Sequence, residues 1–374
     1  IKDCRGLPAV FTREYKVGSN NFQVLSASDS KDYSRWLEIW LSWPRRDIFA
    51  HPGFVSIHES EYEKASAAVY ETGKGVILYP FLKRCLGSLD WLPKQYSSWI
   101  DISSPYGYGG AYYWGEDIAK VEVSDEFWRV YNEWVEKEGC ISEFIRFHLF
   151  EQDLADYPGE KILRSRNIIR NLALSEDSLW MDFEHKVRKN INKSRRLGLK
   201  CIIDEDGRYL DDFLKIYEST MDRRNATGFY YFGRNYFEAI SKNLPDNSVY
   251  FYVLDNGKIV SAELVIYSSS TAYSFLGGTL DEAFDKRPND LLKYQIMLWA
   301  IGRGILNYVL GGGYAPEDGI YRYKRSFAPN GECDFYIGQR VINLSKYKEL
   351  IDIKRNSLNG TWQPRNEYFP QYRF

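Results

Sequence analysis

The stretch that decides the fold lies in the second half of the chain. It reads Val249-Tyr250-Phe251-Tyr252-Val253-Leu254-Asp255-Asn256-Gly257-Lys258-Ile259-Val260-Ser261-Ala262-Glu263-Leu264-Val265-Ile266-Tyr267. Aromatic and β-branched residues flank Asn256-Gly257, a pair that favours a type I′ turn because both central positions of that turn need a positive φ. The stretch therefore predicts an antiparallel hairpin, and residues 271–276 extend it into a three-stranded meander.

A similar pattern occurs in the first half, where residues 67–81 read as strand, glycine-containing turn and strand. Amphipathic helices are predicted before each hairpin, at residues 32–42 and 209–221. After the second meander come a helix at 291–303 that Gly304 ends, a strand at 306–310, and Gly311-Gly312-Gly313. This order resembles the plan of the GNAT superfamily, used twice. We therefore expect an α/β protein (an α+β mixed sheet) with two tandem GNAT-like domains.

The length of 374 residues also favours two domains over one. No stretch rich in proline, glycine and serine marks a linker. We expect an N-terminal domain at 1–170, a C-terminal domain at 171–345 and a C-terminal tail at 346–374.

Composition narrows the classes of function. The net charge of −2 gives no global basic field to attract nucleic acid, so any RNA contact has to be local. The five cysteines (Cys4, Cys85, Cys140, Cys201 and Cys333) show no paired spacing and the four histidines form no zinc motif. No apolar run is long enough to span a membrane. We expect a cytoplasmic protein with reduced thiols and no metal.

The 30 tyrosines suit clefts for sugars, bases or peptides, or simply reflect a tyrosine-rich composition.

The main candidate for chemistry is the segment Tyr321-Arg322-Tyr323-Lys324-Arg325-Ser326-Phe327, in which cationic side chains alternate with rings. A lysine held between aromatic rings can be desolvated and can act as a point charge toward an oxyanion or a phosphate. An edge strand with solvated lysine and arginine explains the same pattern.

Three further segments are candidates for substrate binding. The amides around Gly312 can form an anion nest, or simply a close backbone approach. The basic helix predicted at 185–198, with Arg188, can contact phosphates, or present a solvated face. The loop at 101–110, with Tyr106 and Tyr108 among its glycines, can approach a ligand, or serve as an ordinary surface turn.

One expected signal is missing. Acetyl-CoA-dependent GNAT enzymes hold the pyrophosphate on a glycine-containing loop that opens a helix, because helix N-termini bind anions. The corresponding stretch here, Asp285-Lys286-Arg287-Pro288-Asn289-Asp290-Leu291, has no glycine. This argues against ordinary coenzyme A binding.

The same residues resemble a particular branch of the superfamily. Gly277-Gly278-Thr279, the stretch Arg287-Pro288-Asn289-Asp290-Leu291-Leu292, the glycine triplet and the 321–327 segment are similar to the C-terminal half of Fem-type aminoacyltransferases. The family pattern there is roughly Phe-Lys-x-x-Phe, which Lys324 and Phe327 match and in which Tyr323 replaces the first ring. The basic helix and the 47–55 and 105–110 stretches extend the resemblance over roughly residues 20–340.

The resemblance implies an acyltransferase that moves an aminoacyl group from aminoacyl-tRNA to an amine of a peptidoglycan precursor or a related cell-envelope acceptor. It implies Lys324 and Tyr323 as catalytic residues. As substrate-binding residues we expect Arg188, Arg224, Tyr106, Tyr108, Asn289 and Gly312. Arg224 lies where the family places a cation, and its neighbour Arg223 is an alternative. The helical arm that some members insert in the second half is absent from this sequence.

The partners implied are tRNA and a nucleotide- or lipid-linked cell-wall precursor, with peripheral membrane contact and no cofactor beyond the aminoacyl-tRNA or acyl thioester co-substrate. Two alternatives stay open. One is an N-acyltransferase that uses acyl-CoA or an acyl carrier and modifies a sugar, lipid or peptide in surface-polymer synthesis. The other is a non-catalytic binding protein that keeps the fold, against which Lys324 counts.

Overall fold

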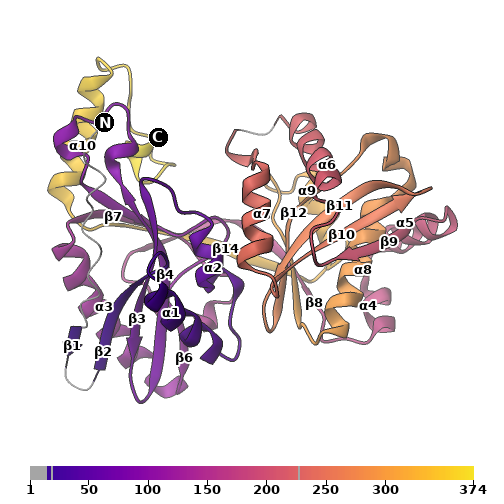
Figure 1. Cartoon of the computed structure of the whole chain (residues 1–374), viewed down its shortest axis with the longest axis horizontal. Helices are drawn as coiled ribbons and strands as arrows, with labels where there is room; N and C mark the ends of the chain where they lie inside the picture. The colour runs from indigo at the N-terminus through magenta and orange to yellow at the C-terminus, as the bar shows by residue number, and fades with distance from the viewer. Residues whose placement is uncertain (1–14, 18–19, 226–227) are drawn as a thin grey trace. The chain divides into compact units, whose positions relative to one another are not determined.

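The computed structural model describes residues 15–17, 20–225 and 228–374, and it divides the chain into two compact units (Figure 1). The first unit comprises the described residues up to Trp43 together with Phe49–Arg164 and Phe335–Phe374. The second comprises Pro44–Ile48 and Ser165–Asp334. Two tandem GNAT-like units on mixed sheets are the architecture that the sequence predicts.

The first unit is a mixed sheet with helices. Its strands are ordered β1-β2-β3-β4-β5-β7-β14, with β6 also paired to β4, and only the β5/β7 pair is parallel. The elements are β1 (Tyr15–Val17), β2 (Asn20–Ser26), α1 (Ser30–Ser42), α2 (Pro52–Ser56), β3 (Glu63–Glu71), β4 (Gly75–Cys85), β5 (Ile100–Ser103), β6 (Tyr112–Gly115), α3 (Lys120–Lys137), β7 (Cys140–Arg146), β14 (Glu332–Val341) and α10 (Leu344–Ser357).

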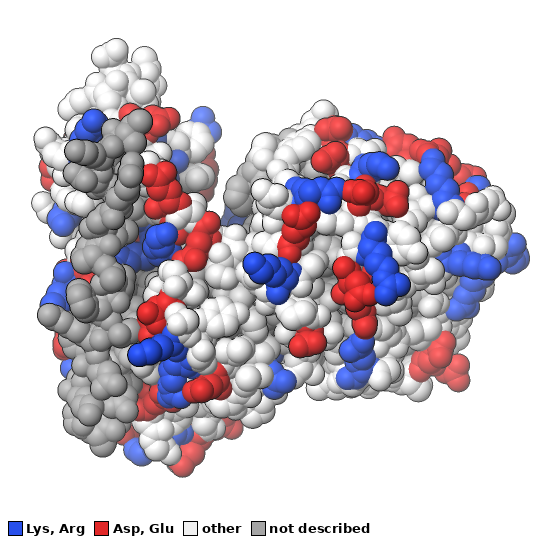
Figure 2. All heavy atoms as spheres, viewed as in Figure 1, with Lys and Arg blue, Asp and Glu red and all other residues white. Residues whose placement is uncertain are grey.

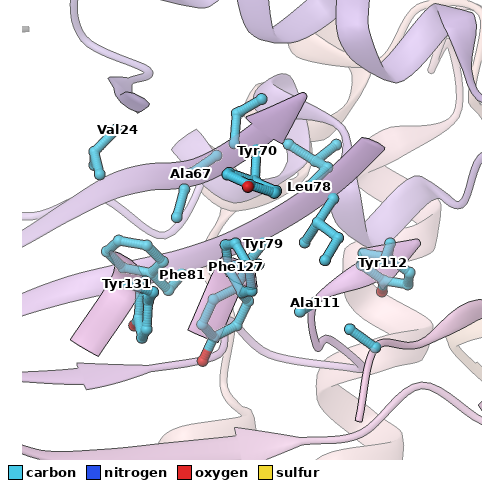
Figure 3. Packing of buried hydrophobic residues seen from close by; sticks show 14 of the residues in the cluster. Val24, Ala67, Tyr70, Leu78, Tyr79, Phe81, Ala111, Tyr112, Phe127 and Tyr131 are labelled. Atoms are coloured by element: carbon cyan, nitrogen blue, oxygen red, sulfur yellow. The ribbon is translucent and has the colours of Figure 1, made fainter. Parts of the chain in front are cut away.

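Aromatic residues fill the core of this unit. Tyr79 and Phe81 of β4 pack against Phe127 and Tyr131 of α3, with ring centroids 5.4 Å apart for the Tyr79–Tyr131 pair (Figure 3). All four side chains are fully buried. Part of the high tyrosine content therefore serves packing, because these hydroxyls find partners inside the core.

The second unit repeats the plan. Its strands are ordered β8-β13-β12-β11-β10-β9, and only the β12/β13 pair is parallel. The elements are β8 (Glu160–Asn171), α4 (Glu176–Asp182), α5 (His185–Arg196), β9 (Lys200–Asp204), α6 (Leu210–Arg223), α7 (Arg234–Asn243), β10 (Ser248–Asp255), β11 (Lys258–Tyr267), β12 (Thr271–Thr279), α8 (Pro288–Gly302), β13 (Asn307–Gly311) and α9 (Gly319–Arg325). A 3₁₀ segment, Asp281–Lys286, joins β12 to α8.

The predicted elements of both halves are confirmed. The β10–β11 hairpin turns at Asn256 and Gly257, and both have the positive φ that the type I′ turn requires. Gly278 lies against Thr220 of α6 so closely that no Cβ would fit there, which lets this helix approach β12. The described part of the second unit contains no inserted helical arm.

The expected domain boundaries need correction at the C-terminal end. The division falls between Arg164 and Ser165 rather than at 170, and residues from Phe335 onward belong to the first unit. The expected tail is not a separate segment, because Tyr347 and Leu350 of α10 pack with Leu86, Ile141 and Tyr372 in a buried cluster. The helical spacing of these apolar residues buries them against the first unit, which returns the end of the chain to it.

In the described part of the chain we compared the surface charges, the cysteine pairs and the apolar character of the helices with the expectations from the sequence. Positive and negative side chains are interspersed on the face drawn in Figure 2. No disulfide joins Cys85, Cys140, Cys201 or Cys333, and Cys4 lies outside the described residues. None of the described helices combines the length and the apolar character needed to cross a bilayer.

Candidate active site

An opening between two parallel strands marks the candidate site in the second unit. The β12/β13 ladder pairs Thr271 with Asn307, Ala272 with Tyr308 and Tyr273 with Val309, and it stops there. Thr271 to Tyr273 are buried, whereas Ser274 to Gly278 of β12 are partly exposed. Beyond Tyr273 the two strands therefore separate, and this place is called the β12/β13 opening below.

The glycine triplet lies where β13 leaves the sheet. Gly311 has φ +78° at a bulge in the β13/β8 pairing, a conformation that favours glycine. A Cβ on Gly312 would lie 3.0 Å from Oδ1 of the buried Asn167. A Cβ on Gly313 would lie 2.5 Å from Oδ1 of Asp318. The triplet therefore serves a close backbone approach.

Lys324 meets this triplet. Its Nζ donates a hydrogen bond of 2.7 Å to the Gly312 carbonyl and lies 3.3 Å from where a Cβ of Gly311 would be. Two of the three ammonium protons remain for other acceptors. Lys324 and Gly312, both expected from the sequence, are thus brought together.

The ammonium group of Lys324 is desolvated, although the residue as a whole is only partly buried. Burial, with a contribution from the positive charge of Lys293, lowers the pKa of Lys324 to about 7. A lysine of this kind changes protonation near neutral pH, and a negative charge that develops beside it favours its protonated form.

The segment that carries Lys324 is a helix, so the alternative of an edge strand is wrong. Asp318 caps α9, because its Oδ1 accepts from the Tyr321 amide at 2.7 Å. At the other end, the buried Arg170 donates from Nη1 to the Phe327 carbonyl at 3.1 Å. The Tyr323 ring packs on Phe327 with centroids 5.2 Å apart. Both ends of the short helix are therefore fixed.

A buried polar network that the sequence analysis missed lies beside the opening. Lys293 of α8 donates to Oε2 of Glu263 at 2.5 Å, to Oγ of Ser274 at 2.6 Å and to the Tyr308 hydroxyl at 3.4 Å. The Tyr308 hydroxyl donates to the other Glu263 oxygen. Lys293 and Glu263 are 5% and 3% exposed. The available signal was a charged residue inside each of two apolar runs, 260–267 and 291–301.

The N-terminus of α8 carries its own anion. Asp290 is buried, accepts from Nδ2 of Asn190 at 3.0 Å and lies in the first turn of the helix. Burial raises the pKa of Asp290 to about 6. A carboxylate at this position competes with a pyrophosphate for the positive end of the helix dipole. Asn289, expected to bind substrate, precedes it and is partly exposed.

Two arginines of the second unit were expected to bind substrate, and their surroundings differ from each other. Arg188 donates to the carbonyls of Met181 (3.0 Å), Trp180 (3.4 Å) and Phe183, so it caps the end of α4. Its guanidinium thus already has a structural role. Arg224 is exposed at the C-terminal end of α6, whereas its neighbour Arg223 is paired with Asp281.

Tyr106 and Tyr108 belong to the first unit, where their loop packs against protein. The Tyr108 ring contacts Phe49 and Phe335 edge-on, with centroids 5.2 and 5.6 Å away. The Arg146 guanidinium lies 5.9 Å from the Tyr106 ring. The loop fills space beside β7, so in this unit the two tyrosines are partly engaged in packing.

Among the described residues, no group of three His, Cys, Asp or Glu side chains is arranged to hold a metal ion.

The chain was compared with protein-family models and with solved structures. Residues 182–325 match the family model described as an acetyltransferase (GNAT) domain. The structure is similar to that of FemX, with a TM-score of 0.62 and 14% identity over 85% of this chain and 98% of that one. It is also similar to a conserved protein of unknown function from Bacteroides thetaiotaomicron VPI-5482, with a TM-score of 0.53 and 14% identity over 85% and 98% of the two chains.

A third similar structure is the C-terminal domain of a provisionally named lysylphosphatidylglycerol synthetase from Agrobacterium fabrum. Its TM-score is 0.51, with 14% identity over 85% of this chain and 93% of that one. No curated protein matches the chain in sequence. Residues 182–325 therefore form a GNAT-type domain, and the fold of the chain is similar to that of FemX and of the lysylphosphatidylglycerol synthetase domain.

Proposed function

We propose that this protein transfers an aminoacyl group from aminoacyl-tRNA to an amine of a peptidoglycan precursor or a related cell-envelope acceptor, in the cytoplasm. The observation that carries the proposal is the desolvated Lys324 ammonium, 2.7 Å from the Gly312 carbonyl in the glycine triplet at the end of β13. FemX, which shares the fold, and the lysylphosphatidylglycerol synthetase domain, whose name joins an amino acid to a lipid, support this substrate class.

In the proposed reaction the acceptor amine attacks the ester carbonyl of the donor. Holding the two reactants in the opening supplies much of the rate enhancement, because it replaces a bimolecular encounter with an oriented one. Negative charge then develops on the carbonyl oxygen, which raises the proton affinity of Lys324 and strengthens its hydrogen bond to that oxygen. The Tyr323 ring, which packs on Phe327, supports the helix that carries the lysine. No covalent enzyme intermediate is required.

The second candidate function is an N-acyltransferase that uses acyl-CoA or an acyl carrier. The GNAT domain match favours it in general terms. The first turn of α8 argues against coenzyme A, because it holds the Asp290 carboxylate where a pyrophosphate would bind and has no glycine from Asp285 to Leu291.

Donor binding separates the two candidates. Charged tRNA, uncharged tRNA, acetyl-CoA and longer acyl-CoAs are compared by filter binding and thermal shift at low salt. We expect charged tRNA to bind and the thioesters not to bind. Binding of a thioester alone would replace the first proposal by the second, and the acceptor is then sought among nucleotide- and lipid-linked precursors by mass spectrometry of the product.

Membrane contact is tested separately. An acceptor anchored in a lipid layer calls for a peripheral encounter of the protein with that layer. Flotation with anionic vesicles, with and without a lipid-linked precursor, measures it. Binding that needs the precursor supports a lipid-linked acceptor, and transfer to a soluble nucleotide-linked precursor with no vesicle binding contradicts it.

A further inference from the structure

Ser274 occupies a distinctive place in the second unit. It is the first residue of β12 beyond the last ladder pair, Tyr273 with Val309, and it is partly exposed where the three residues before it are buried. The partly exposed Ser274 is therefore the residue of β12 at which the β12/β13 opening begins.

The partner of this hydroxyl fixes what it can do. Oγ of Ser274 lies 2.6 Å from Nζ of Lys293. A charged ammonium group has donors and no acceptor, so the serine oxygen accepts and its own proton remains to be donated. Within the network that proton has the Tyr308 oxygen as an acceptor. A ligand oxygen in the opening offers another, and rotation about the Cβ–Oγ bond exchanges them.

Lys293 is held in one position. Glu263 accepts from it at 2.5 Å and receives the Tyr308 hydroxyl on its other oxygen, and all three side chains are buried. Replacing a buried ion pair with apolar residues of similar volume is often neutral or stabilising, so stability alone is a weak reason for such a pair. The hydrogen bond from Lys293 to the partly exposed Ser274 suggests a second reason for the buried pair, namely that it holds this serine in position.

We propose that Ser274 is a second hydrogen-bond donor to the carbonyl oxygen of the acyl group, and that Lys293, Glu263 and Tyr308 are the residues that position it. This inference rests on the proposed acyl transfer, and it holds for an ester or a thioester donor. The positive charge of Lys293 polarises the serine O–H bond, since hydrogen bonds in a chain strengthen one another. Ser274 and Lys324 then share the developing charge.

The electrons and protons balance without a further reactant. The amine lone pair forms the new C–N bond, and the carbonyl π pair moves onto the oxygen that Ser274 and Lys324 contact. The pair then returns, the bond to the donor's leaving oxygen or sulfur breaks, and the leaving atom takes the proton that the amine nitrogen releases.

The test is steady-state kinetics of Ser274→Ala with whichever donor the wild-type protein uses. We expect kcat to fall about 10- to 100-fold with KM nearly unchanged, because an oxyanion donor acts only in the transition state. Lys293→Met is expected to give a similar loss, and Lys293→Arg, which keeps the charge, a smaller one. Ser269→Ala, in the exposed turn before β12, is the matched control with wild-type kinetics. Melting temperatures verify that each variant is folded.

Wild-type kcat in folded Ser274→Ala, or a loss confined to KM, would overturn the inference. Failure of the proposed function appears differently, as an inactive wild-type protein. In that case a phosphonate analogue of the tetrahedral intermediate is the probe. Tighter binding to wild type than to Ser274→Ala by about 10-fold or more supports the donor role, and equal binding refutes it.

Discussion

The two units build the same parallel strand pair in different ways. In the second unit the β12/β13 ladder ends at Tyr273 and Val309 and the strands separate. In the first unit the β5/β7 pairing is continued beyond Ser103 by the following loop. The Ser104 amide donates to the Phe144 carbonyl at 2.9 Å, and the His148 amide donates to the Gly109 carbonyl at 2.7 Å. The loop with Tyr106 and Tyr108 thus closes the space that stays open in the second unit.

Each unit also has a buried glutamate, and the two glutamates have different partners. Glu143 in the first unit accepts from three tyrosine hydroxyls, Tyr79, Tyr131 and Tyr157, and pairs with Arg340 at 3.1 Å. Glu263 in the second unit binds Lys293 and Tyr308, and that network reaches the partly exposed Ser274. One fold therefore supports a cluster of three tyrosines and an arginine around Glu143 in one unit, and a network that includes the partly exposed Ser274 in the other.

The largest expected effect comes from Glu143→Gln. The change leaves Arg340, whose side chain is only 14% exposed, without its anion, so we expect the free energy of unfolding to fall by about 3–5 kcal/mol. Transfer activity per folded molecule should not change. Chemical denaturation and kinetics on the same preparation measure both quantities.

A matched control is Glu133→Gln, which removes an exposed carboxylate paired with Arg129 on α3. Its cost should stay below about 0.5 kcal/mol. Loss of turnover in folded Glu143→Gln would break the comparison, because it would place chemistry in the first unit.

The second prediction concerns Lys324→Met. Loss of the ammonium donor should lower kcat by at least about 100-fold in a folded protein, as removal of an oxyanion donor does in other enzymes. Arg325→Met, a partly exposed neighbour on α9 paired with Glu317 and Glu332, is the control with near wild-type kcat. Wild-type turnover in Lys324→Met would remove this lysine from the mechanism.

The same lysine predicts a dependence of stability on pH. Its folded pKa of about 7 lies below its ordinary value of 10.5. Between these values the unfolded chain binds more protons at this group, so its contribution to stability rises with pH over that window and is flat below it. Lys324→Met should therefore be more stable than wild type by about 1–3 kcal/mol at pH 7, and the difference should shrink toward pH 10.

Denaturation curves at pH 7, 8.5 and 10 measure that difference. Lys189→Met, an exposed lysine on α5, is the control and should show a small difference that does not vary with pH. A constant difference for Lys324→Met would mean that its ammonium group is hydrated.

The smallest effect is expected for Arg188→Ala. Loss of its hydrogen bonds to three carbonyls at the end of α4 should cost about 1–2 kcal/mol of stability. The sequence also predicts weaker binding of a phosphate-bearing ligand. Filter binding of tRNA at low salt tests this, with Arg196→Ala on the exposed face of α5 as the comparison. Lower stability with unchanged affinity would leave Arg188 as a helix cap.

The regular elements could be predicted because their signals are local. Asn256-Gly257 specifies a turn, and the spacing of apolar residues specifies α1, α6 and α8. The 321–327 pattern singled out Lys324 as a candidate, and the structure shows its hydrogen bond to Gly312. The absence of glycine before α8 predicts weak coenzyme A binding, which stays a prediction.

The tertiary structure alone decided the rest, because it depends on which distant residues meet. It returned α10 to the first unit and made the Tyr106–Tyr108 loop the closure of a strand pair. It bonded Arg188 to three carbonyls at the end of α4. It also joined side chains from three strands and a helix in one network, namely Glu263, Ser274, Lys293 and Tyr308. The sequence by itself determined the strands and the helices, and it singled out one lysine as a candidate. Desolvation, ion pairing and the point at which two strands separate follow only from packing, because each is set by groups far apart along the chain.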